Sequence, residues 1–372
     1  MILVIVAGGK GKRLGKLTEK LPKPMMRIHK TSFLYRLVHY YTKFNISKIF
    51  IMTGYKSNLI ENEFHNKFIN GVQIQCIKEK KPLGNFGCLF FLKKKIKDNF
   101  FLYVNGDTVL ETDINKLISF SSGSKSLMLL TKASKNTNHK LSIKNFNELK
   151  YNKNGKYIST GVVKLNRNVL KLCFNRFMNF ETDVVPGLIK KKEILGRYND
   201  SYFVDIGTIN NLRKFILRDK IKKPAIFLDR DGTINEDKGY TYKETDLKIV
   251  DKNISFIKKF NLNNKFIFIT SNQGGIAKGL FNEIQMNRFY RKLKLELSKK
   301  KILIDKYSYC PHHPDGKIKK FRKLCKFRKP GNHMIEALMK IWPVDRKKSI
   351  LIGDSIVDKE ASKKSKIRFY KV

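Results

Sequence analysis

The sequence predicts an α/β protein with two doubly wound domains, each built on a mostly parallel sheet. Three observations lead to this prediction. The chain has 372 residues, which exceeds the usual size of a single hydrophobic core and is enough for two. Short apolar runs alternate with helical patterns in both halves, which is typical of parallel strands covered by helices. A polar, basic segment, Arg218–Pro224, separates the two series.

The predicted strands follow the apolar runs in order. The first series comprises Ile2–Val6, Ile49–Thr53, Val72–Ile77, Phe100–Asn105 and Ser126–Leu130, then a less regular region, Lys135–Leu165, with a turn at Asn154-Gly155 and a strand at Gly161–Leu165. The second series begins at Ala225 and continues at Lys265–Thr270, Ile304–Tyr309, Ser349–Ile352 and Arg368–Tyr370. We therefore predict one domain over residues 1–217, a linker over 218–224 and a second domain over 225–372.

The chain is strongly basic, with 78 lysines and arginines against 31 acidic residues and a formal net charge of +47. Clustered cations release counterions from phosphates, so a nucleic-acid partner is one interpretation. The lysines are spread through both halves, however, and runs such as Lys93–Lys95 fall at ends of predicted helices, where cations suit the helix dipole. We therefore favour a positive field that attracts small phosphorylated substrates, with no nucleic-acid partner.

The sequence also bears on the cellular compartment. No apolar run is long enough to cross a bilayer, and no cleavage-type segment precedes the first glycine loop. The five cysteines do not look like a disulfide framework, which fits a reducing compartment. We expect a cytoplasmic protein with no membrane partner.

The first strand leads into a glycine loop, Gly8, Gly9 and Gly11, followed by Arg13. Backbone amides in such a loop can wrap phosphate oxygens, and an arginine can bind them with two hydrogen bonds. A glycine loop alone is weak evidence. Two further pieces strengthen it: prolines on both sides hold Lys23 in an extended segment, and Asp107 follows a strand end, where it suits magnesium.

These pieces resemble the sugar-phosphate nucleotidylyltransferases, particularly the heptose 1-phosphate guanylyltransferase-like group, across residues 1–217. The resemblance implies a nucleotidyltransferase Rossmann-like domain in which a sugar phosphate attacks the α-phosphorus of a nucleoside triphosphate, GTP or another, and expels pyrophosphate. It implies that Asp107 and Asp205 hold magnesium and that Glu181 and Asp183 lie near the sugar. The implied nucleotide-binding residues are Gly8, Gly9, Gly11, Arg13, Lys23, Gly84 and Asp107.

Two segments depart from the pattern of this group. Members usually carry a Glu-Lys-Pro segment whose lysine meets the sugar phosphate, but here Asn154-Gly155 leads almost directly into Ser159 with no evident counterpart of that lysine. Asn85-Phe86 stands where a smaller pair is usual. The domain is therefore either active with altered contacts or retained as a scaffold, and we favour activity.

The second series begins with an apolar strand that ends in Asp229 and Asp231. Side chains two residues apart near a strand end address the same site. One carboxylate can attack phosphorus, while the other protonates the leaving oxygen and later activates water. Gly232 permits the sharp exit from the strand. An Asp-Gly turn is also common after strands without any function, but that explanation does not account for the polar groups that follow.

Further phosphate-binding and metal-binding groups come after the later strands. Ser271 offers a hydroxyl at the end of the next strand, Arg328 and Lys329 supply cations, and Asp354 is a third acid at a strand end. Ligands of open parallel sheets bind at the carboxyl ends of the strands, so we expect these residues to meet there. The order and spacing together are a strong signal.

Residues 225–372 resemble the heptose 1,7-bisphosphate phosphatase branch of the haloacid dehalogenase superfamily, which implies a haloacid dehalogenase Rossmann-like domain. By this resemblance Asp229 is the nucleophile, Asp231 is the general acid and base, and Ser271 and Lys329 stabilise the transferring phosphoryl group. Magnesium would be held by Asp229, the backbone carbonyl of Asp231, and Asp354. The residues that match substrate-contacting segments are Asp237, Gly239, Tyr240, Asn272, Gln273, Gly274 and Arg328. Ser355 stands where the family often has a basic residue.

A cysteine- and histidine-containing loop resembles the zinc loop of the same phosphatases. Cys310, His312 and Cys325 match three ligand positions, but Phe327 occupies the fourth. Structural zinc sites normally have four ligands. Either His313 or His333 completes a zinc site, or the loop has lost its metal.

The two resemblances together imply consecutive steps in one chain. The phosphatase would convert a heptose 1,7-bisphosphate to the 1-phosphate, and the other domain would activate that product as a nucleotide-heptose for lipopolysaccharide or another surface glycan. Two alternatives remain: a phosphatase for another small metabolite such as histidinol phosphate, with an inactive N-terminal domain, or a phosphatase acting on DNA ends.

Overall fold

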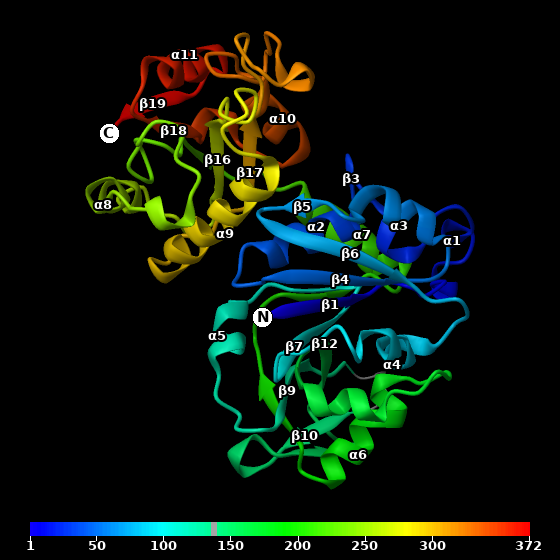
Figure 1. Ribbon diagram of the computed structural model, residues 1–372. Coiled ribbons are helices and arrows are strands. Elements are labelled where there is room, and N and C mark those ends of the chain that lie inside the picture. Colours follow the sequence, from blue (N-terminus) through cyan, green and yellow to red (C-terminus); the bar gives the residue numbers. More distant parts are fainter. Residues whose placement is uncertain (135–139) are drawn as a thin grey trace. The chain divides into compact units, whose positions relative to one another are not determined.

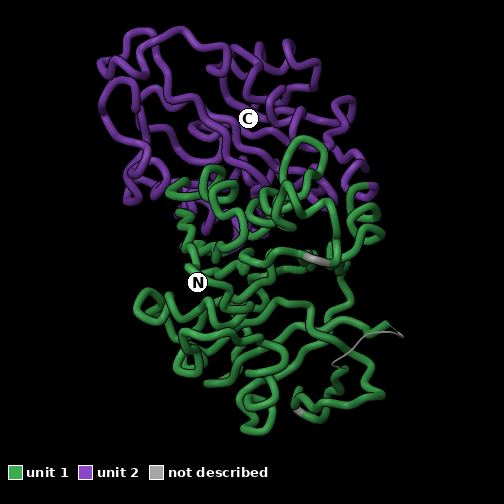
Figure 2. The backbone as a smooth tube through the Cα atoms, turned by 90° about the vertical axis from the view of Figure 1, so that its right-hand side faces the viewer, with its two compact units in different colours: residues 1–41, 45–67, 73–216 green, residues 42–44, 68–72, 217–372 purple. Residues whose placement is uncertain are grey.

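The computed structural model describes residues 1–134 and 140–372, so the start of the irregular region predicted over 135–165 lies outside the described residues. The chain divides into two compact units (Figure 2). The first unit comprises residues 1–41, 45–67 and 73–216, and the second comprises residues 42–44, 68–72 and 217–372.

A mixed sheet forms the centre of the first unit (Figure 1). Strand β1 (Ile2–Val6) pairs in parallel with β4 (Lys48–Thr53) and β7 (Phe100–Asn105), and β6 (Val72–Lys78) continues the parallel part beyond β4. On the other side β12 (Tyr157–Asn166) runs antiparallel to β7 and to β9 (Ser126–Lys132). The predicted strands are therefore present, and the sheet also has an antiparallel part.

Smaller elements complete the first unit. Its other strands are β2 (Arg27–Ile28), β3 (Thr31–Ser32), β8 (Thr108–Leu110), β10 (Leu141–Ile143), β11 (Leu149–Tyr151), β13 (Ile194–Tyr198) and β14 (Phe203–Asp205). The residues of β5 (Phe68–Ile69) fall in the second unit. Its helices are α1 (Leu17–Lys20), α2 (Phe33–Thr42), α3 (Ser57–Phe64), α4 (Gly84–Gly87), α5 (Ile114–Ser119), α6 (Val185–Lys190) and α7 (Ile209–Asp219).

The second unit has a five-stranded parallel sheet in the order β17-β16-β15-β18-β19. The strands are β15 (Ala225–Leu228), β16 (Phe266–Asn272), β17 (Lys306–Cys310), β18 (Ile350–Gly353) and β19 (Arg368–Lys371). The helices are α8 (Asp251–Lys258), α9 (Glu283–Lys299), α10 (His333–Ile341) and α11 (Ile356–Lys364).

Strand β15 is apolar along its whole length because both faces of the sheet are covered at this strand. Ile226 and Leu228 pack with residues of α8 and α9, whereas Ala225 and Phe227 pack with residues of α10 and α11. Successive side chains of a strand point to opposite faces, so a strand covered by helices on both faces is apolar throughout. The central residues of β15 are therefore buried and apolar, and the polar residues follow at the end of the strand.

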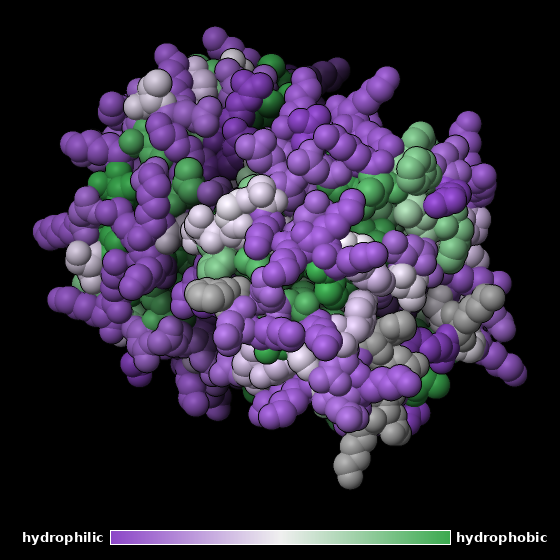
Figure 3. Space-filling model, turned by 90° about the horizontal axis from the view of Figure 1, so that it is seen from below, coloured by the Kyte–Doolittle hydropathy of each residue, from purple (hydrophilic) through white to green (hydrophobic). Residues whose placement is uncertain are grey.

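One face of the molecule shows how hydrophilic and hydrophobic side chains are distributed on the surface. The face seen in Figure 3 is dominated by hydrophilic side chains, with smaller hydrophobic areas between them. Over the described parts of the chain, the helices include none with the length and apolar character of a membrane span.

Candidate functional site

The carboxyl ends of three neighbouring strands gather the predicted phosphatase residues. β15 lies between β16 and β18 and is parallel to both. Asp229 directly follows β15, Ser271 is the penultimate residue of β16, and Asp354 directly follows β18. Because the strands run in the same direction, these three residues lie at the same edge of the sheet.

Three carboxylates form a cluster at this edge. Asp229, Asp354 and Asp358 each offer an oxygen, and these oxygens lie within 4.8 Å of one another. The sequence analysis missed Asp358, because it lies in the first turn of α11 and not at a strand end. The available signal was an acid four residues after Asp354. Carboxylate oxygens gathered in this way fit the preference of Mg²⁺ for hard oxygen ligands.

Lys329 lies buried between two of these acids. Its Nζ donates to Asp229 Oδ1 and, at 2.5 Å, to Asp358 Oδ1. Burial opposes the charged form of the lysine, but the two carboxylates outweigh it and raise the pKa of Lys329. Burial also raises the pKa of Asp229 to about 7, although the attraction of Lys329 acts in the opposite direction. A cation is thus held against Asp229, where a phosphoryl group would need one.

The carboxylate of Asp231 is fixed by donors from three residues. Arg230 Nε lies 2.9 Å from Oδ1, and Arg230 Nη2 lies 2.6 Å from Oδ2. Asn235 Nδ2 donates to Oδ1 at 3.0 Å, and Gln273 Nε2 donates to Oδ2 at 3.1 Å. This carboxylate is not one of the three clustered acids, so a metal contact from Asp231 would come from its backbone carbonyl.

Hydrogen bonds after β16 connect the pieces of this site. Gln273 Nε2 donates to the buried Ser271 Oγ at 2.7 Å. Asn272 Nδ2 donates to the backbone oxygen of Lys329, and the backbone nitrogen of Lys329 donates to Asn272 Oδ1, both at 2.9 Å. The segment that carries Lys329 is therefore held against the end of β16.

Gly232 is required by both its conformation and its surroundings. Its φ is +80°, in the region that L side chains rarely adopt. A Cβ atom at this position would lie 2.2 Å from Asp354 Oδ2. The chain can therefore turn away from Asp231 and still let Asp354 approach.

The other predicted substrate-contacting residues fall into two places. Asp237, Gly239 and Tyr240 lie on an exposed loop, where Gly239 N donates to Asp237 Oδ1 at 2.9 Å. Gly274 and Arg328 lie together, because a Cβ atom on Gly274 would be 3.0 Å from Arg328 Nη1.

A second candidate metal group contains Cys310, His312 and Cys325, whose ligand atoms lie within 4.8 Å of one another. The ring of Phe327, at the expected fourth position, lies 5.7 Å from that of His333. Within the described parts of the chain, neither His313 nor His333 belongs to this group. The three predicted ligands are therefore together, without a fourth from the residues considered.

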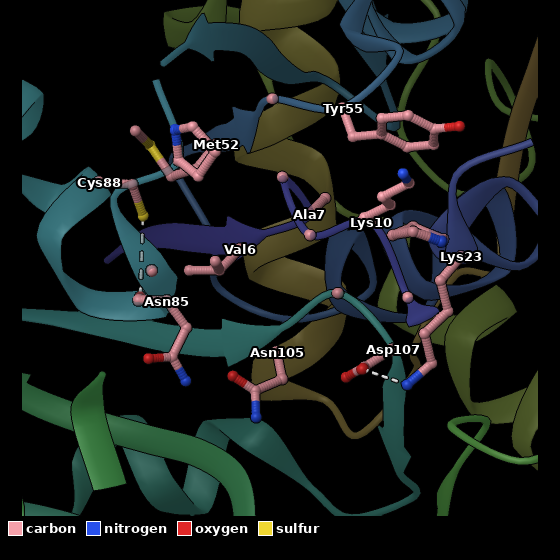
Figure 4. A pocket seen from close by; sticks show the side chains of 18 of the residues that line it. Val6, Ala7, Lys10, Lys23, Met52, Tyr55, Asn85, Cys88, Asn105 and Asp107 are labelled. Atoms are coloured by element: carbon pink, nitrogen blue, oxygen red, sulfur yellow. Dashed lines mark hydrogen bonds and ion pairs between the residues drawn. The ribbon is translucent and has the colours of Figure 1, made fainter. Parts of the chain in front are cut away.

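The first unit contains a cavity of about 1020 Å³ at the ends of β1, β4 and β7. Its lining includes every residue predicted to bind the nucleotide or its metal: Gly8, Gly9, Gly11, Arg13, Lys23, Gly84, Asp107 and Asp205. Part of this lining is shown in Figure 4, where Lys23 reaches towards Asp107.

Strand pairing brings the two predicted magnesium ligands of this cavity together. β8 and β14 are antiparallel, with Asp205 opposite Thr108, so Asp205 lies next to Asp107. Lys23 Nζ forms ion pairs with Asp107 and, at 3.1 Å, with Asp205 Oδ1. Arg13 Nη2 lies 3.9 Å from Asp205 Oδ2. The cavity therefore has a pair of acids beside cations suited to a triphosphate.

Glu79 also lines the cavity, and the sequence analysis did not identify it. Leu83 N donates to Glu79 Oε2 at 3.1 Å, and burial raises the pKa of Glu79 despite this hydrogen bond. A Cβ atom on Gly54 would lie 2.4 Å from Glu79 Oε1, so the carboxylate is held close to the backbone of the cavity wall. The available signal was an acid three residues before Pro82.

Asn85 and Phe86, which depart from the family pattern, have clear structural roles. Asn85 Nδ2 donates to Glu181 Oε2 at 2.8 Å, and Phe180 N donates to Asn85 Oδ1 at 2.7 Å. Phe86 is fully buried and stacks on Phe180, with ring centroids 5.8 Å apart. The larger pair therefore fastens the segment that carries Glu181 to the wall of the cavity.

The missing lysine was expected between Asn154-Gly155 and Ser159, where the chain enters β12, and Lys156 does not line the cavity. The strand before this turn, β11, contacts the segment that carries Glu181. Tyr151 Oη donates to the backbone oxygen of Glu181 at 2.8 Å, whereas the adjacent Lys150 is exposed and does not line the cavity. Side chains alternate along a strand, so only one of these two neighbours can face Glu181. Asp183 is exposed, and its Oδ2 accepts from Asn179 N at 2.8 Å, so of the two predicted acids Glu181 lines the cavity and Asp183 does not.

Comparisons with known proteins give separate matches for the N-terminal and the C-terminal parts of the chain. Residues 2–220 match the family model of nucleotidyl transferases, and residues 224–369 match that of polynucleotide kinase 3 phosphatase. The chain is 39% identical over 142 residues to D-glycero-beta-D-manno-heptose-1,7-bisphosphate 7-phosphatase of Rhodopseudomonas palustris, covering 38% of this chain and 79% of that protein. The corresponding phosphatase of Escherichia coli K12 is 34% identical over 139 residues, 37% of this chain and 73% of that protein.

Among solved structures, HddC from Yersinia pseudotuberculosis is similar to the N-terminal part. It is 26% identical, with a TM-score of 0.51, and the match covers 58% of this chain and 98% of HddC. A second structure of HddC is a complex with GMP-PN and matches to the same extent. The chain belongs to the nucleotidyl transferase family through its N-terminal part and, through its C-terminal part, to the family of the heptose bisphosphate 7-phosphatases.

Proposed function

We propose that the C-terminal unit hydrolyses the 7-phosphate of D-glycero-D-manno-heptose 1,7-bisphosphate through an aspartyl phosphate. The observation that carries the proposal is the gathering of Asp229, Asp354 and Asp358 around Lys329 at one edge of the sheet. An Asp229 oxygen would attack phosphorus while the bond to the sugar oxygen breaks, and Asp231 would give that oxygen its proton. Water would then attack the aspartyl phosphate and give a proton to Asp231, which releases phosphate and restores Asp229.

The residues around Asp229 divide the work of binding the phosphoryl group. Ser271 Oγ and Lys329 Nζ would donate to its oxygens, where negative charge accumulates. Asp229, Asp354 and the backbone carbonyl of Asp231 would hold Mg²⁺, with Asp358 as a further ligand, and the ion would neutralise charge on the phosphoryl group. We propose a zinc ion only for the loop of Cys310, His312 and Cys325, where it would have a structural role.

For the N-terminal unit we propose nucleotidyl transfer onto heptose 1-phosphate. Arg13, Lys23 and the glycine loop would hold the triphosphate, with Asp107 and Asp205 as ligands of a second Mg²⁺. The sugar phosphate would attack the α-phosphorus and expel pyrophosphate, a reaction that depends on positioning and charge neutralisation. Glu181 would accept a hydrogen bond from a sugar hydroxyl.

We propose GTP as the nucleotide because Glu79 lines the cavity and accepts from Leu83 N, in the segment Pro82-Leu83-Gly84 that the resemblance to the nucleotidylyltransferases places near the base. An ionised carboxylate only accepts hydrogen bonds. Guanine presents two adjacent donors on its Watson–Crick edge, N1–H and the N2 amino group, whereas the other bases present an acceptor beside their donor. A partly buried carboxylate at the base would therefore select guanine.

Together the two steps would convert a heptose bisphosphate into a nucleotide-heptose in the cytoplasm, where nucleoside triphosphates are supplied. A DNA-end phosphatase is the second candidate, since the net charge is +47 and residues 224–369 match the polynucleotide kinase 3 phosphatase model. We favour the heptose substrate because the relatives with that activity are 34–39% identical over most of their length.

The test is incubation of the full chain with heptose 1,7-bisphosphate, magnesium and each nucleoside triphosphate in turn, with phosphate and pyrophosphate measured separately. Histidinol phosphate and a 3′-phosphorylated oligonucleotide serve as competing substrates. Phosphate and GTP-dependent pyrophosphate are the expected products. Phosphate without pyrophosphate would confine activity to the C-terminal unit, and faster release from the oligonucleotide would overturn the heptose assignment.

A further inference from the structure

Arg230 lies at the phosphatase strand end, and the proposed mechanism gives it no role. It lies between the proposed nucleophile Asp229 and the proposed acid Asp231, yet its side chain is fully buried. A buried guanidinium is costly unless it is paired and hydrogen-bonded. Its location therefore needs an explanation in terms of its partners.

The guanidinium of Arg230 is directed at Asp231 and held from behind. Nε lies 2.9 and 3.0 Å from the two oxygens of Asp231, and Nη2 lies 2.6 Å from Oδ2. Nη2 also donates to the backbone oxygen of Thr241 at 2.6 Å. The guanidinium carbon lies 4.7 Å from the centroid of the Phe289 ring, a distance suited to a cation–π contact. A planar fork fixed in this way can hold a carboxylate in only one plane.

We propose that Arg230 is the positioning residue of the phosphatase reaction: it orients the Asp231 carboxylate for proton transfer to the leaving oxygen and from the attacking water. The inference rests on the proposed function, since it assumes that Asp231 exchanges that proton. Asp231 lies on the turn after β15, and Asn235 and Gln273 each give its carboxylate a single hydrogen bond. Arg230 gives it a two-point contact, which fixes direction as well as position.

Leaving groups distinguish this role from a structural one. A sugar alkoxide is a poor leaving group and needs a proton from Asp231, whereas nitrophenolate departs as an anion without one. A correctly placed general acid contributes about 100- to 10,000-fold. We expect Arg230→Lys to lower kcat for an alkyl phosphate such as the heptose bisphosphate by about 10- to 100-fold, with little change in KM. Release of nitrophenolate by the same variant in the first turnover, before Asp231 is needed to activate water, should fall by less than about 3-fold.

The experiment compares both esters on the full chain. Arg288→Lys is the matched control, because Arg288 is an exposed arginine on the helix that carries Phe289, and it should leave both rates unchanged. If Arg230→Lys does not fold, Phe289→Leu removes the aromatic ring that packs against the guanidinium. This variant should show a smaller loss of rate, again larger for the alkyl ester than for the nitrophenyl ester. In an Asp231→Asn background, Arg230→Lys should have no further effect on the ratio of the two rates.

Equal loss in the first-turnover rates of both esters, or an additive effect in the Asp231→Asn background, would overturn the positioning role. These outcomes are separate from failure of the proposed function, which would show as a wild-type chain that releases no phosphate from either ester.

Discussion

Replacement of Gly232 by alanine tests how the metal-binding edge depends on one backbone position. The new Cβ atom would lie 2.2 Å from Asp354 Oδ2, whereas ordinary contacts begin at 3.4 Å. Asp354 must therefore shift by about 1.2 Å, which changes its position relative to Asp229 and Asp358. A misplacement of about 1 Å in a catalytic arrangement can cost about 100-fold in rate. The positive φ adds a conformational cost of about 1–2 kcal/mol to folding.

The matched control is Gly279→Ala in the same unit. Gly279 also has a positive φ, +74°, but its Cβ atom would meet only the Ile318 side chain, at 3.6 Å. Both variants should therefore lose about 1–2 kcal/mol of unfolding free energy in urea through the positive φ, and Gly232→Ala should lose more because its Cβ atom also clashes with Asp354. Only Gly232→Ala should show phosphate release lowered by about 100-fold at fixed Mg²⁺, with a higher Mg²⁺ concentration needed for half-maximal rate.

Two results would refute this reasoning. One is a Gly232→Ala variant with wild-type turnover and an unchanged Mg²⁺ requirement, which would mean that Asp354 does not need its position. The other is a Gly279→Ala variant with the same loss of activity, which would assign the effect to backbone strain alone.

Four further predictions concern both sites. Asp229→Asn should abolish phosphate release with an unchanged thermal melt, and residual steady turnover would argue against a covalent intermediate on this residue. Lys329→Met leaves Asp229 and Asp358 buried without their cation, so urea unfolding at neutral pH should show a loss of about 3–5 kcal/mol, against none for the exposed Lys347→Met. The raised pKa of Glu79 means that its carboxylate takes up a proton at a higher pH than an ordinary glutamate, so GTP affinity should weaken as the pH falls through that value. Glu79→Gln should remove this pH dependence. If the variant keeps the wild-type pH profile, Glu79 does not bind the base of the nucleotide. Asn85→Ala removes one hydrogen bond to Glu181, which contributes about 1.5 kcal/mol, so KM for heptose 1-phosphate should rise about 10-fold while KM for GTP stays unchanged. The exposed control, Asn168→Ala, should leave both KM values unchanged.

Much of the phosphatase edge was accessible from the sequence because its residues follow apolar strands. Asp229, Ser271 and Asp354 each follow or end a strand, and parallel strands bring such residues together without further information. Asp358 was missed because it belongs to a helix, where an acid near the first turn is common as a partner of the helix dipole. Its burial against Lys329 depends on tertiary packing, which no local pattern reports.

The orientation of side chains was the least accessible part. Asp231 was predicted to address the same site as Asp229, but its ion pair with Arg230 could not be predicted, since adjacent residues of a strand usually point to opposite faces. The structure brings them together only after β15 has ended, in the turn at Gly232. In the same way, the alternation along β11 decides that Tyr151 faces Glu181 and Lys150 does not, and the sequence alone leaves that register open.

Asp358 uses its two oxygens for different purposes. Oδ1 accepts from Lys329 Nζ, while Oδ2 accepts from the backbone nitrogen of Ser355 at 3.3 Å and from its hydroxyl. The same carboxylate that faces the reaction thus also starts a helix. Selection for turnover and selection for folding therefore act on a single side chain here. A library that varies this position to change substrate preference will mostly yield chains in which the helix does not form, so their activity cannot be assayed.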